Sequence, residues 1–196
     1  MKRFVFGVLL LGVLLPLSAV RMHAADCDIV GPLRVQYEIT RNLVLAMADA
    51  IPESKYDYKP TAEVRTFREQ LIHLINETYN YMGLAAGEPL EDPKRFDKLK
   101  SRSEILKTLK ESYGHGTKVL AAMTNEQANE IVSISPQATI GLRGQQRARW
   151  AIVLAVLIDN MDHYGNLVVY SRLNGIVPPR TAERNAAQQE PPATVK

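Results

Sequence analysis

The feature that most constrains the fold is the sequence AIVLAVLI at 151–158, in which every side chain is apolar. A helix built from these residues has no polar face, so other elements are expected to cover it on all sides. The helical pattern around this run extends from about 145 to 173, and the Asn-Gly pair at 174–175, followed by two prolines, is a typical helix stop. The chain is therefore expected to fold around one buried helix in its C-terminal part.

Three further segments show the apolar periodicity of a helix. In the segment 33–51 the apolar positions alternate in spacings of four and three and end before a proline. The sequence TFRE at 66–69 is a capping box, because its hydroxyl and carboxylate can satisfy backbone amides at a helix start, and it predicts a helix over 66–86. A second capping box at 101–104 predicts another helix over 102–122.

The connections between these segments complete the predicted fold. Gly114 and Gly116 interrupt the third helix and predict a bend or a close helix contact there. Residues 124–144 are mixed in character, and IVSIS at 131–135 predicts a short extended piece within an irregular crossover. Four long helices joined in this way predict an all-α four-helix bundle over residues 33–176, with a longer crossover before the last helix.

The two ends of the chain are expected to lie outside this bundle. Residues 1–25 combine two basic residues, an apolar run of 17 residues and small residues near position 25, which is the pattern of a signal peptide. The run is shorter than the about 20 residues of a membrane-spanning helix, so we expect export to the periplasm or the cell exterior and no membrane attachment after cleavage. Residues 26–32 form a short leader, and residues 177–196, almost without large apolar side chains, are predicted to be disordered.

Charge and cysteine content exclude several classes of function. Removal of residues 1–25 takes away three basic residues and no acid, so 24 basic residues become 21 against 21 acidic ones. A neutral mature chain without a basic stripe argues against binding to nucleic acid. Cys27 is the single cysteine, which excludes an internal disulfide and a zinc site built from thiolates.

The apolar helix carries two polar side chains in line with its core residues. Asp159 and His163 are one helical turn apart, on the face that Ile152 and Val156 begin and Leu167 continues. A buried charge without a partner is destabilising by roughly several kcal/mol, so both groups need a partner. A divalent metal ion is one such partner, and a hydrogen bond between the two side chains is the structural alternative.

A third candidate ligand, His73, lies on the predicted helix over 66–86. On a helical wheel it falls with Glu69, Glu77 and Asn80, opposite the apolar arc of that helix. This position favours a solvated histidine beside Glu77. If His73 instead lined a groove at the end of a bundle, it could act as a metal ligand. The residues alone leave the role of His73 undecided.

Two blocks of the sequence resemble one known family. The block KPTAEVRTFREQLIHLINETYNYMGLAAGE at 59–88 resembles an early block of the DinB-like four-helix bundle proteins, and DNMDHYGNLVVYSRLNGIVPP at 159–179 resembles their closing block. The blocks occur in the right order and at about the right separation, and the similarity spans most of the mature chain. The resemblance implies a four-helix bundle, as the periodicity does.

The resemblance also implies a metal site. In that family three histidines hold a divalent metal ion, one from the second helix and two, one turn apart, from the last helix. By position, His73 and His163 match two of these ligands, and Asp159 replaces the third. Two histidines and one carboxylate form a common facial ligand set for zinc, nickel, iron or manganese, with open positions for water or substrate.

An activity on a small molecule follows from the same resemblance. Some members of the wider superfamily are transferases or isomerases that use a low-molecular-weight thiol, which the metal would bind. The metal could equally activate water for hydrolysis, with Glu77 as general base. Tyr164 and Asn166 match the closing block and are candidate cofactor-binding groups that orient His163, whereas His115 is expected to be structural.

Two classes of function therefore stay open. The first is an exported metal-dependent enzyme, either a thiol transferase or a hydrolase. The second is a non-catalytic binding or stress-related bundle with a degenerate metal site. A homodimer is compatible with either class.

Overall fold

A computed structural model describes residues 27–90, 92, 94–138 and 140–189, and the predicted signal peptide at 1–25 lies outside them. These residues form six α-helices, one short 3-10 helix and two short strands. In chain order the elements are α1 (Val30–Ala50), η2 (Glu53–Lys55), α2 (Phe67–Ala86), α3 (Arg102–Ala122), α4 (Asn125–Ala128), β1 (Ile131–Ser133), β2 (Gln146–Ala148), α5 (Arg149–Leu173) and α6 (Pro179–Gln189).

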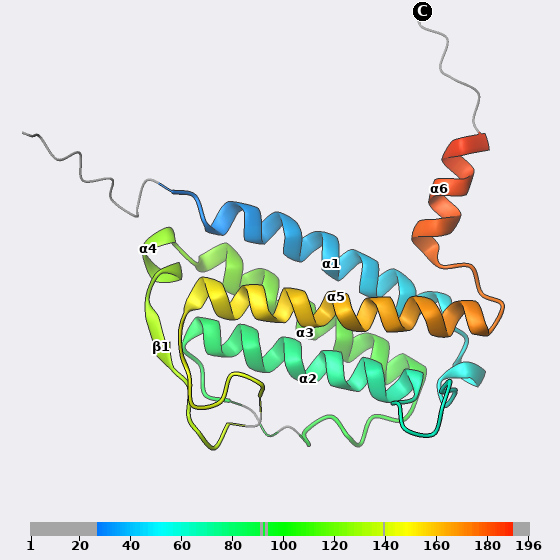
Figure 1. Cartoon of the computed structure of the whole chain (residues 1–196), viewed down its shortest axis with the longest axis horizontal. Coiled ribbons are helices and arrows are strands. Elements are labelled where there is room, and N and C mark those ends of the chain that lie inside the picture. The colour runs from blue at the N-terminus through cyan, green and yellow to red at the C-terminus, as the bar shows by residue number, and fades with distance from the viewer. Residues whose placement is uncertain (1–26, 91, 93, 139, 190–196) are drawn as a thin grey trace, which may run out of the picture.

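Four long helices, α1, α2, α3 and α5, form the bundle (Figure 1). α2 packs against α3 and α5, and α1 packs against the same two helices. The all-α four-helix bundle predicted from the sequence is confirmed, and each long helix starts and ends within four residues of its predicted bounds.

The predicted capping boxes form and fix the starts of α2 and α3. The Thr66 hydroxyl accepts a hydrogen bond from the Glu69 backbone N–H at 3.1 Å, and the Glu69 carboxylate accepts one from the Thr66 N–H at 2.7 Å. Ser101 and Glu104 repeat the arrangement at α3. α2 ends at Gly87, whose φ of 85° lies in the left-handed region that favours glycine.

The apolar helix α5 packs against α1 and α2. Ile152, Val156 and Leu167 are fully buried, as predicted. The expectation that other elements cover the helix on all sides is wrong for Leu154 and Ile158, which are exposed, because each helix of a four-helix bundle keeps one face toward solvent. By length and composition α5 could also cross a membrane, but its buried side chains form part of the core here.

Gly116 marks a close approach between α1 and α3. A Cβ atom at this position would collide with the Tyr37 hydroxyl, which donates a hydrogen bond to the Tyr113 carbonyl at 3.3 Å. The predicted close helix contact is therefore confirmed at Gly116, whereas a Cβ at Gly114 would meet open space.

The crossover between α3 and α5 is longer than the other connections and contains regular structure. β1 and β2 pair in antiparallel fashion, with Ile131 opposite Ala148. The extended piece predicted at 131–135 is confirmed over the three residues of β1. α5 begins at Arg149 rather than at 145, because residues 146–148 pair with β1.

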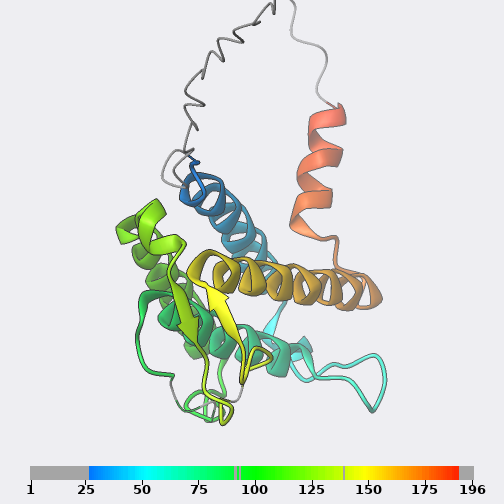
Figure 2. The same cartoon turned by 60° about the vertical axis from the view of Figure 1, so that its left-hand side comes forward.

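The C-terminal segment differs from the predicted disordered tail over 177–196. Residues 179–189 form α6, and the backbone N–H groups of Thr181 and Ala182 donate to the Pro178 carbonyl. Proline suits a first helical turn, which needs no N–H from it, and the following Ala, Arg, Glu and Gln residues are good helix formers. α6 packs against α1 and extends away from the bundle (Figure 2). The low apolar content of this segment argued against a core there, but it did not exclude a helix.

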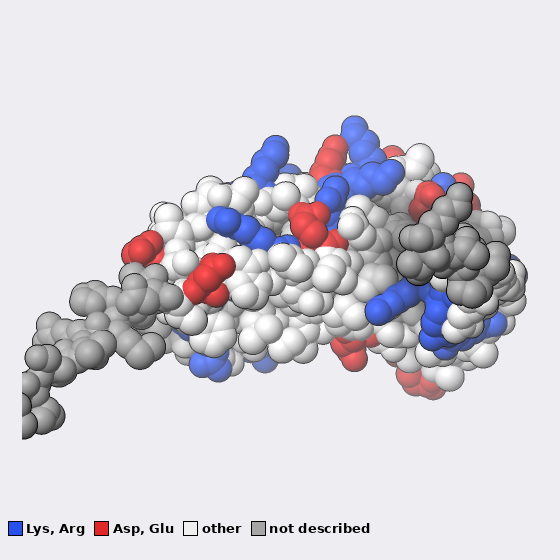
Figure 3. Space-filling view, turned by 90° about the horizontal axis from the view of Figure 1, so that it is seen from above, with Lys and Arg blue, Asp and Glu red and all other residues white. Residues whose placement is uncertain are grey.

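Charged side chains of both signs occur on the face of the bundle seen from the α1 side (Figure 3). Basic and acidic side chains lie next to one another over the middle of this face, and several basic side chains lie together toward the right of the picture.

Candidate metal centre

The three side chains predicted as metal ligands converge between α2 and α5. His73 Nε2 lies 4.0 Å from Asp159 Oδ2, and His163 Nε2 lies 3.6 Å from Asp159 Oδ1. The two imidazole rings have centroids 4.5 Å apart and are inclined at 70°. One ligand atom from each residue lies within 4.8 Å of the other two, and no other such group of His, Cys, Asp or Glu occurs among the described residues.

This spacing is wider than a hydrogen bond and leaves room for an ion. Ligand atoms bound to a divalent ion at roughly 2.0 to 2.2 Å lie about 3 to 3.5 Å from one another. The three side chains therefore need to move inward by about 1 Å when an ion binds.

The Asp159 carboxylate is not fully paired within the cluster. Its Oδ2 atom is buried and has no hydrogen-bond partner among the described residues. A buried polar atom without a partner is destabilising by about 1–3 kcal/mol, and an ion between the three ligands would relieve this. Carboxylate oxygen and imidazole nitrogen are both common donors to divalent metals, so the residues present fit a metal ion.

Gln70 fixes the orientation of His163 and was not predicted from the sequence. Its Oε1 atom accepts a hydrogen bond from His163 Nδ1 at 2.6 Å, and both side chains are buried. Because Nδ1 carries the proton, Nε2 keeps its lone pair and faces Asp159. Metal-binding histidines typically have such a partner. The one available sequence signal was the position of Gln70 three residues before His73, on the same face of α2.

Burial keeps both imidazoles neutral. Burial, together with the Arg65 charge and His163, lowers the pKa of His73 to about 4. Burial also lowers the pKa of His163, although Asp159 acts in the opposite direction, and it raises the pKa of Asp159. The close His–Asp pairs are therefore not ion pairs at neutral pH. Since metal ligation requires unprotonated imidazole, the two histidines are ready to bind an ion.

Glu77, the candidate catalytic residue, lies one turn beyond His73 on α2 and lines the same groove. Burial, with an added effect of the Asp159 charge, raises the pKa of Glu77 to about 7. Its carboxyl group is hydrogen-bonded to Tyr81, which also bonds to the backbone of Gly141 in the crossover. A carboxyl group with a pKa near neutrality beside a candidate metal centre suits a general base.

Two grooves reach the cluster from the surface, and Arg65 lines both of them. The first has a volume of about 800 Å³ and is lined by His73 and Glu77. The second has a volume of about 760 Å³ and is lined by Gln70 and His163. Such access is typical of catalytic metal sites, which keep a position open, rather than of closed structural sites.

The two candidate cofactor-binding residues take different positions. Asn166 lines the second groove with His163, and its Nδ2 atom donates to Asp162 Oδ2 at 3.4 Å. Tyr164 instead lies in a pocket beside α1 and the start of α6, together with residues such as Ile39. Orientation of His163, the role expected for both, is carried out by Gln70. His115 lies outside the cluster, 3.2 Å from Glu88, as a structural role would require.

The fold and the His–Asp–His cluster together define a helical bundle with a candidate metal centre. The family follows from the sequence, because the model of the DinB superfamily matches residues 36–167, which include all three candidate ligands. The chain therefore belongs to the DinB superfamily, and the family predicted from two sequence blocks is confirmed.

Among solved structures, the chain is similar to YjoA, a DinB-like protein from Bacillus subtilis. The TM-score is 0.58 at 18% sequence identity, and the match covers 74% of this chain and 92% of that one. At this identity the likeness shows a shared fold alone. No curated protein matches the sequence.

Proposed function

We propose that this protein binds one divalent metal ion through His73, Asp159 and His163, and that the centre acts enzymatically on a small molecule. The observation that carries the proposal is the buried, unpartnered Oδ2 atom of Asp159, grouped within 4.8 Å with two imidazole ligand atoms. Two nitrogen donors and one oxygen donor suit zinc, nickel, iron or manganese.

The reaction we propose is activation of a nucleophile by removal of a proton. When bound, the ion would act as a Lewis acid that lowers the pKa of a coordinated water molecule or low-molecular-weight thiol. Glu77, in the groove beside His73, accepts the proton, and Tyr81 holds the Glu77 carboxyl group in place. Arg65, which lines both grooves, is placed to pair with an anionic group of the substrate.

The experiment compares the metal-loaded wild type with Glu77→Gln in two assays. One follows hydrolysis of a nitrophenyl ester, and the other follows transfer of a cysteine thiol to chlorodinitrobenzene. Loss of the general base should slow the reaction by about a hundredfold or more without changing metal content. Glu111→Gln, the same change at an exposed site on α3, should leave the rate unchanged.

The two assays also separate the two reactions. A rate that requires the thiol identifies a thiol transferase, and a rate without it identifies a hydrolase. Metal-loaded protein that is inactive in both assays, or Glu77→Gln protein as fast as the wild type, would contradict the enzymatic proposal. The non-catalytic binding bundle would then be the better account.

The predicted signal peptide at 1–25 supports the additional proposal that the protein acts in the periplasm or outside the cell. Mass spectrometry of the exported protein should give an N-terminus near residue 25. An intact N-terminus in the membrane fraction, or an acyl group on Cys27, would contradict this proposal.

A further inference from the structure

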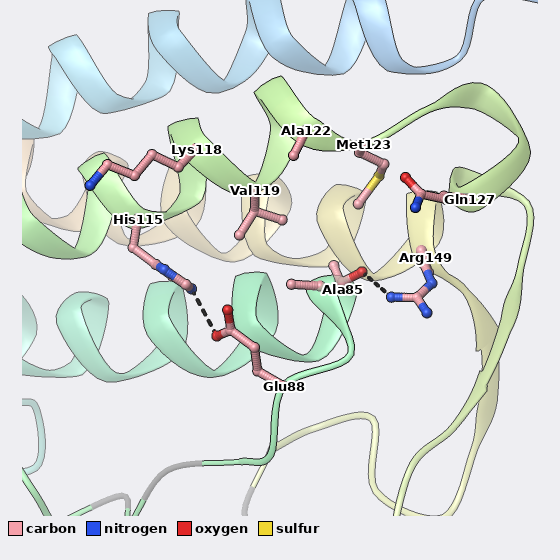
Figure 4. A pocket seen from close by; sticks show the side chains of 10 residues that line it. Ala85, Glu88, His115, Lys118, Val119, Ala122, Met123, Gln127 and Arg149 are labelled. Carbon is pink, nitrogen blue, oxygen red and sulfur yellow. Dashed lines mark hydrogen bonds and ion pairs between the residues drawn. The ribbon is translucent and has the colours of Figure 1, made fainter.

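Another pocket (Figure 4) lies where α2 ends and α5 begins, away from the metal centre. Its volume is about 450 Å³, and its wall comes from the ends of α2 and α3, from α4 and from the start of α5. Ala85 in this wall is roughly 18 Å along α2 from His73, at a rise of 1.5 Å per residue. The pocket shares no lining residue with the two grooves at the metal centre.

The middle of this pocket is apolar. Ala85, Val119 and Met123 lie between its two polar ends in Figure 4. Covering such a surface contributes about 25 cal/mol per Å² of apolar area removed from water. The wall therefore favours a ligand with a hydrocarbon or aromatic body.

One polar end presents hydrogen-bond donors in fixed positions. Arg149 Nη1 donates to the Ala85 carbonyl at 2.7 Å, and Arg149 Nε and Nη2 each lie 3.0 Å from Glu130 Oε2. The two hydrogen bonds and the ion pair leave N–H groups on Nη1 and Nη2 without a hydrogen-bond partner among the described residues. Gln127 adds an amide donor, because its Oε1 accepts from the Thr124 N–H while its Nε2 bonds to no described residue.

The other polar end carries a negative group. His115 Nε2 lies 3.2 Å from Glu88 Oε2, and the His115 ring stacks on Tyr79 with centroids 5.5 Å apart. His115 and Glu88 point toward each other across this end of the pocket (Figure 4). Lys118 also lines this end, where the Glu88 carboxylate disfavours an anion, and the N–H donors without a partner at the Arg149 end are the better partners for the anionic group of a ligand.

We infer that this pocket binds a small monocarboxylate, with its carboxylate on Arg149 and Gln127 and its apolar body on Ala85, Val119 and Met123. The guanidinium N–H groups on Nη1 and Nη2 that have no hydrogen-bond partner suit the two oxygens of a carboxylate. Glu88 and Glu130 disfavour a ligand with several negative charges. The volume falls within the roughly 300 to 1,000 Å³ of small-molecule sites. The inference does not depend on the metal centre.

The test is equilibrium dialysis of the full chain against isotope-labelled octanoate, with EDTA present so that the metal centre cannot bind the carboxylate. Octanol and octylammonium provide probes of equal length with a neutral and a positive end. Octanoate should bind with saturation and about tenfold more tightly than octanol, because a charged hydrogen bond contributes roughly 1.4 kcal/mol or more. Octylammonium should bind most weakly.

Two variants and a control locate the site. Gln127→Glu keeps the oxygen that caps the Thr124 N–H but places an anion at the donor end, so octanoate should bind about tenfold more weakly. Val119→Phe fills the pocket and should weaken octanoate and octanol alike. Gln36→Glu makes the same charge change on α1, outside the pocket, and should bind octanoate as the wild type does.

Three results would overturn the inference. They are the absence of saturable octanoate binding, equal octanoate affinity in the wild type and Gln127→Glu, and tighter binding of octylammonium than of octanoate. Because EDTA removes metal from every sample, none of these results bears on metal binding by His73, Asp159 and His163.

Discussion

The polar side chains at the two ends of the α2–α5 interface differ in how they are paired with other groups of the protein. At one end, Arg149 is held by the Glu130 carboxylate and the Ala85 carbonyl. At the other end, His73 and Asp159 approach each other without a hydrogen bond, and Asp159 Oδ2 is left buried without one. The Arg149 guanidinium is therefore paired within the protein, whereas Asp159 Oδ2 is not. The unpartnered Asp159 Oδ2 marks a contact that a bound metal ion would supply.

The two ends should contribute to stability in different ways. The contacts of Arg149 should stabilise the fold whether or not metal is present, whereas the cluster at the other end should stabilise it only with a bound ion. Variants at the two ends should therefore differ in their dependence on metal as well as in the size of their effects.

The largest expected contrast is in stabilisation by metal. Zinc at about a thousandfold excess over its Kd should stabilise the wild type by about 4 kcal/mol, and His163→Ala should abolish this gain because a ligand is lost. His115→Ala changes a histidine at the other end and should keep the gain, as should Asp159→His, which restores the family ligand set. Thermal denaturation with and without zinc measures the effect. If zinc raised the melting temperature of His163→Ala and His115→Ala equally, the two ends would not differ in their dependence on metal.

The next contrast concerns Arg149. Arg149→Ala should lower the free energy of unfolding by about 2–3 kcal/mol, because the Ala85 carbonyl and Glu130 lose their partner. Urea denaturation should give the same loss in EDTA and in zinc. Arg172→Ala, an exposed arginine on the same helix, should change the stability by less than about 0.5 kcal/mol. A loss at Arg149 that depends on metal would contradict the separation of the two ends.

A pH-dependent effect is expected at Glu77 in the metal-free protein. Its pKa is about 7 in the folded state against an ordinary value of 4.5, so the folded chain holds a proton that the unfolded chain releases between these values. The stability that Glu77 contributes is complete below pH 4.5 and is lost as the pH rises through 7. Gln is neutral throughout, so Glu77→Gln should match the wild type at low pH and exceed its stability at pH 8 by on the order of 2 kcal/mol, allowing for partial exposure.

Denaturant titrations at several pH values check this prediction, with Glu111→Gln as the exposed control. A stability difference between Glu77→Gln and the wild type that does not change with pH would show that Glu77 is not held in a desolvated site.

The smallest expected effect is that of Gln70, which acts on the metal through His163. Gln70→Leu removes the acceptor for His163 Nδ1–H and should weaken zinc binding about tenfold. Gln70→Glu keeps an acceptor oxygen and should restore the affinity. Competition titration with a zinc chelator distinguishes this positioning role from packing, since packing alone would make Leu at least as good as Glu.

Local signals predicted most of the fold. The capping boxes at Thr66 and Ser101 formed because each needs only four consecutive residues, and Gly116 marked a close approach that a side chain would block. α6 was not predicted, because composition alone does not distinguish a polar helix from a disordered segment. The pairing of β2 with β1 was also missed, since it depends on residues that are distant in sequence.

The sequence predicted some residues of the candidate site more clearly than others. Asp159 and His163 were found because their positions continue a buried stripe on α5. The helical wheel misplaced His73, because it assumed one apolar face for α2, whereas polar residues such as Asn76, Thr78 and Asn80 are also buried. The contacts of α2 with both α3 and α5 explain this burial. The family resemblance, which the superfamily match confirms, supplied what periodicity could not.

The central claim, that His73, Asp159 and His163 hold a divalent ion, is tested most directly by elemental analysis of protein purified from its native compartment. The wild type should contain about one zinc, nickel, iron or manganese ion per chain, and His73→Ala should contain none, because loss of a ligand that closes the facial set weakens binding severely. Wild-type protein without an ion, or equal metal content in His73→Ala, would contradict the claim and return His73 to the role of a partly solvated histidine.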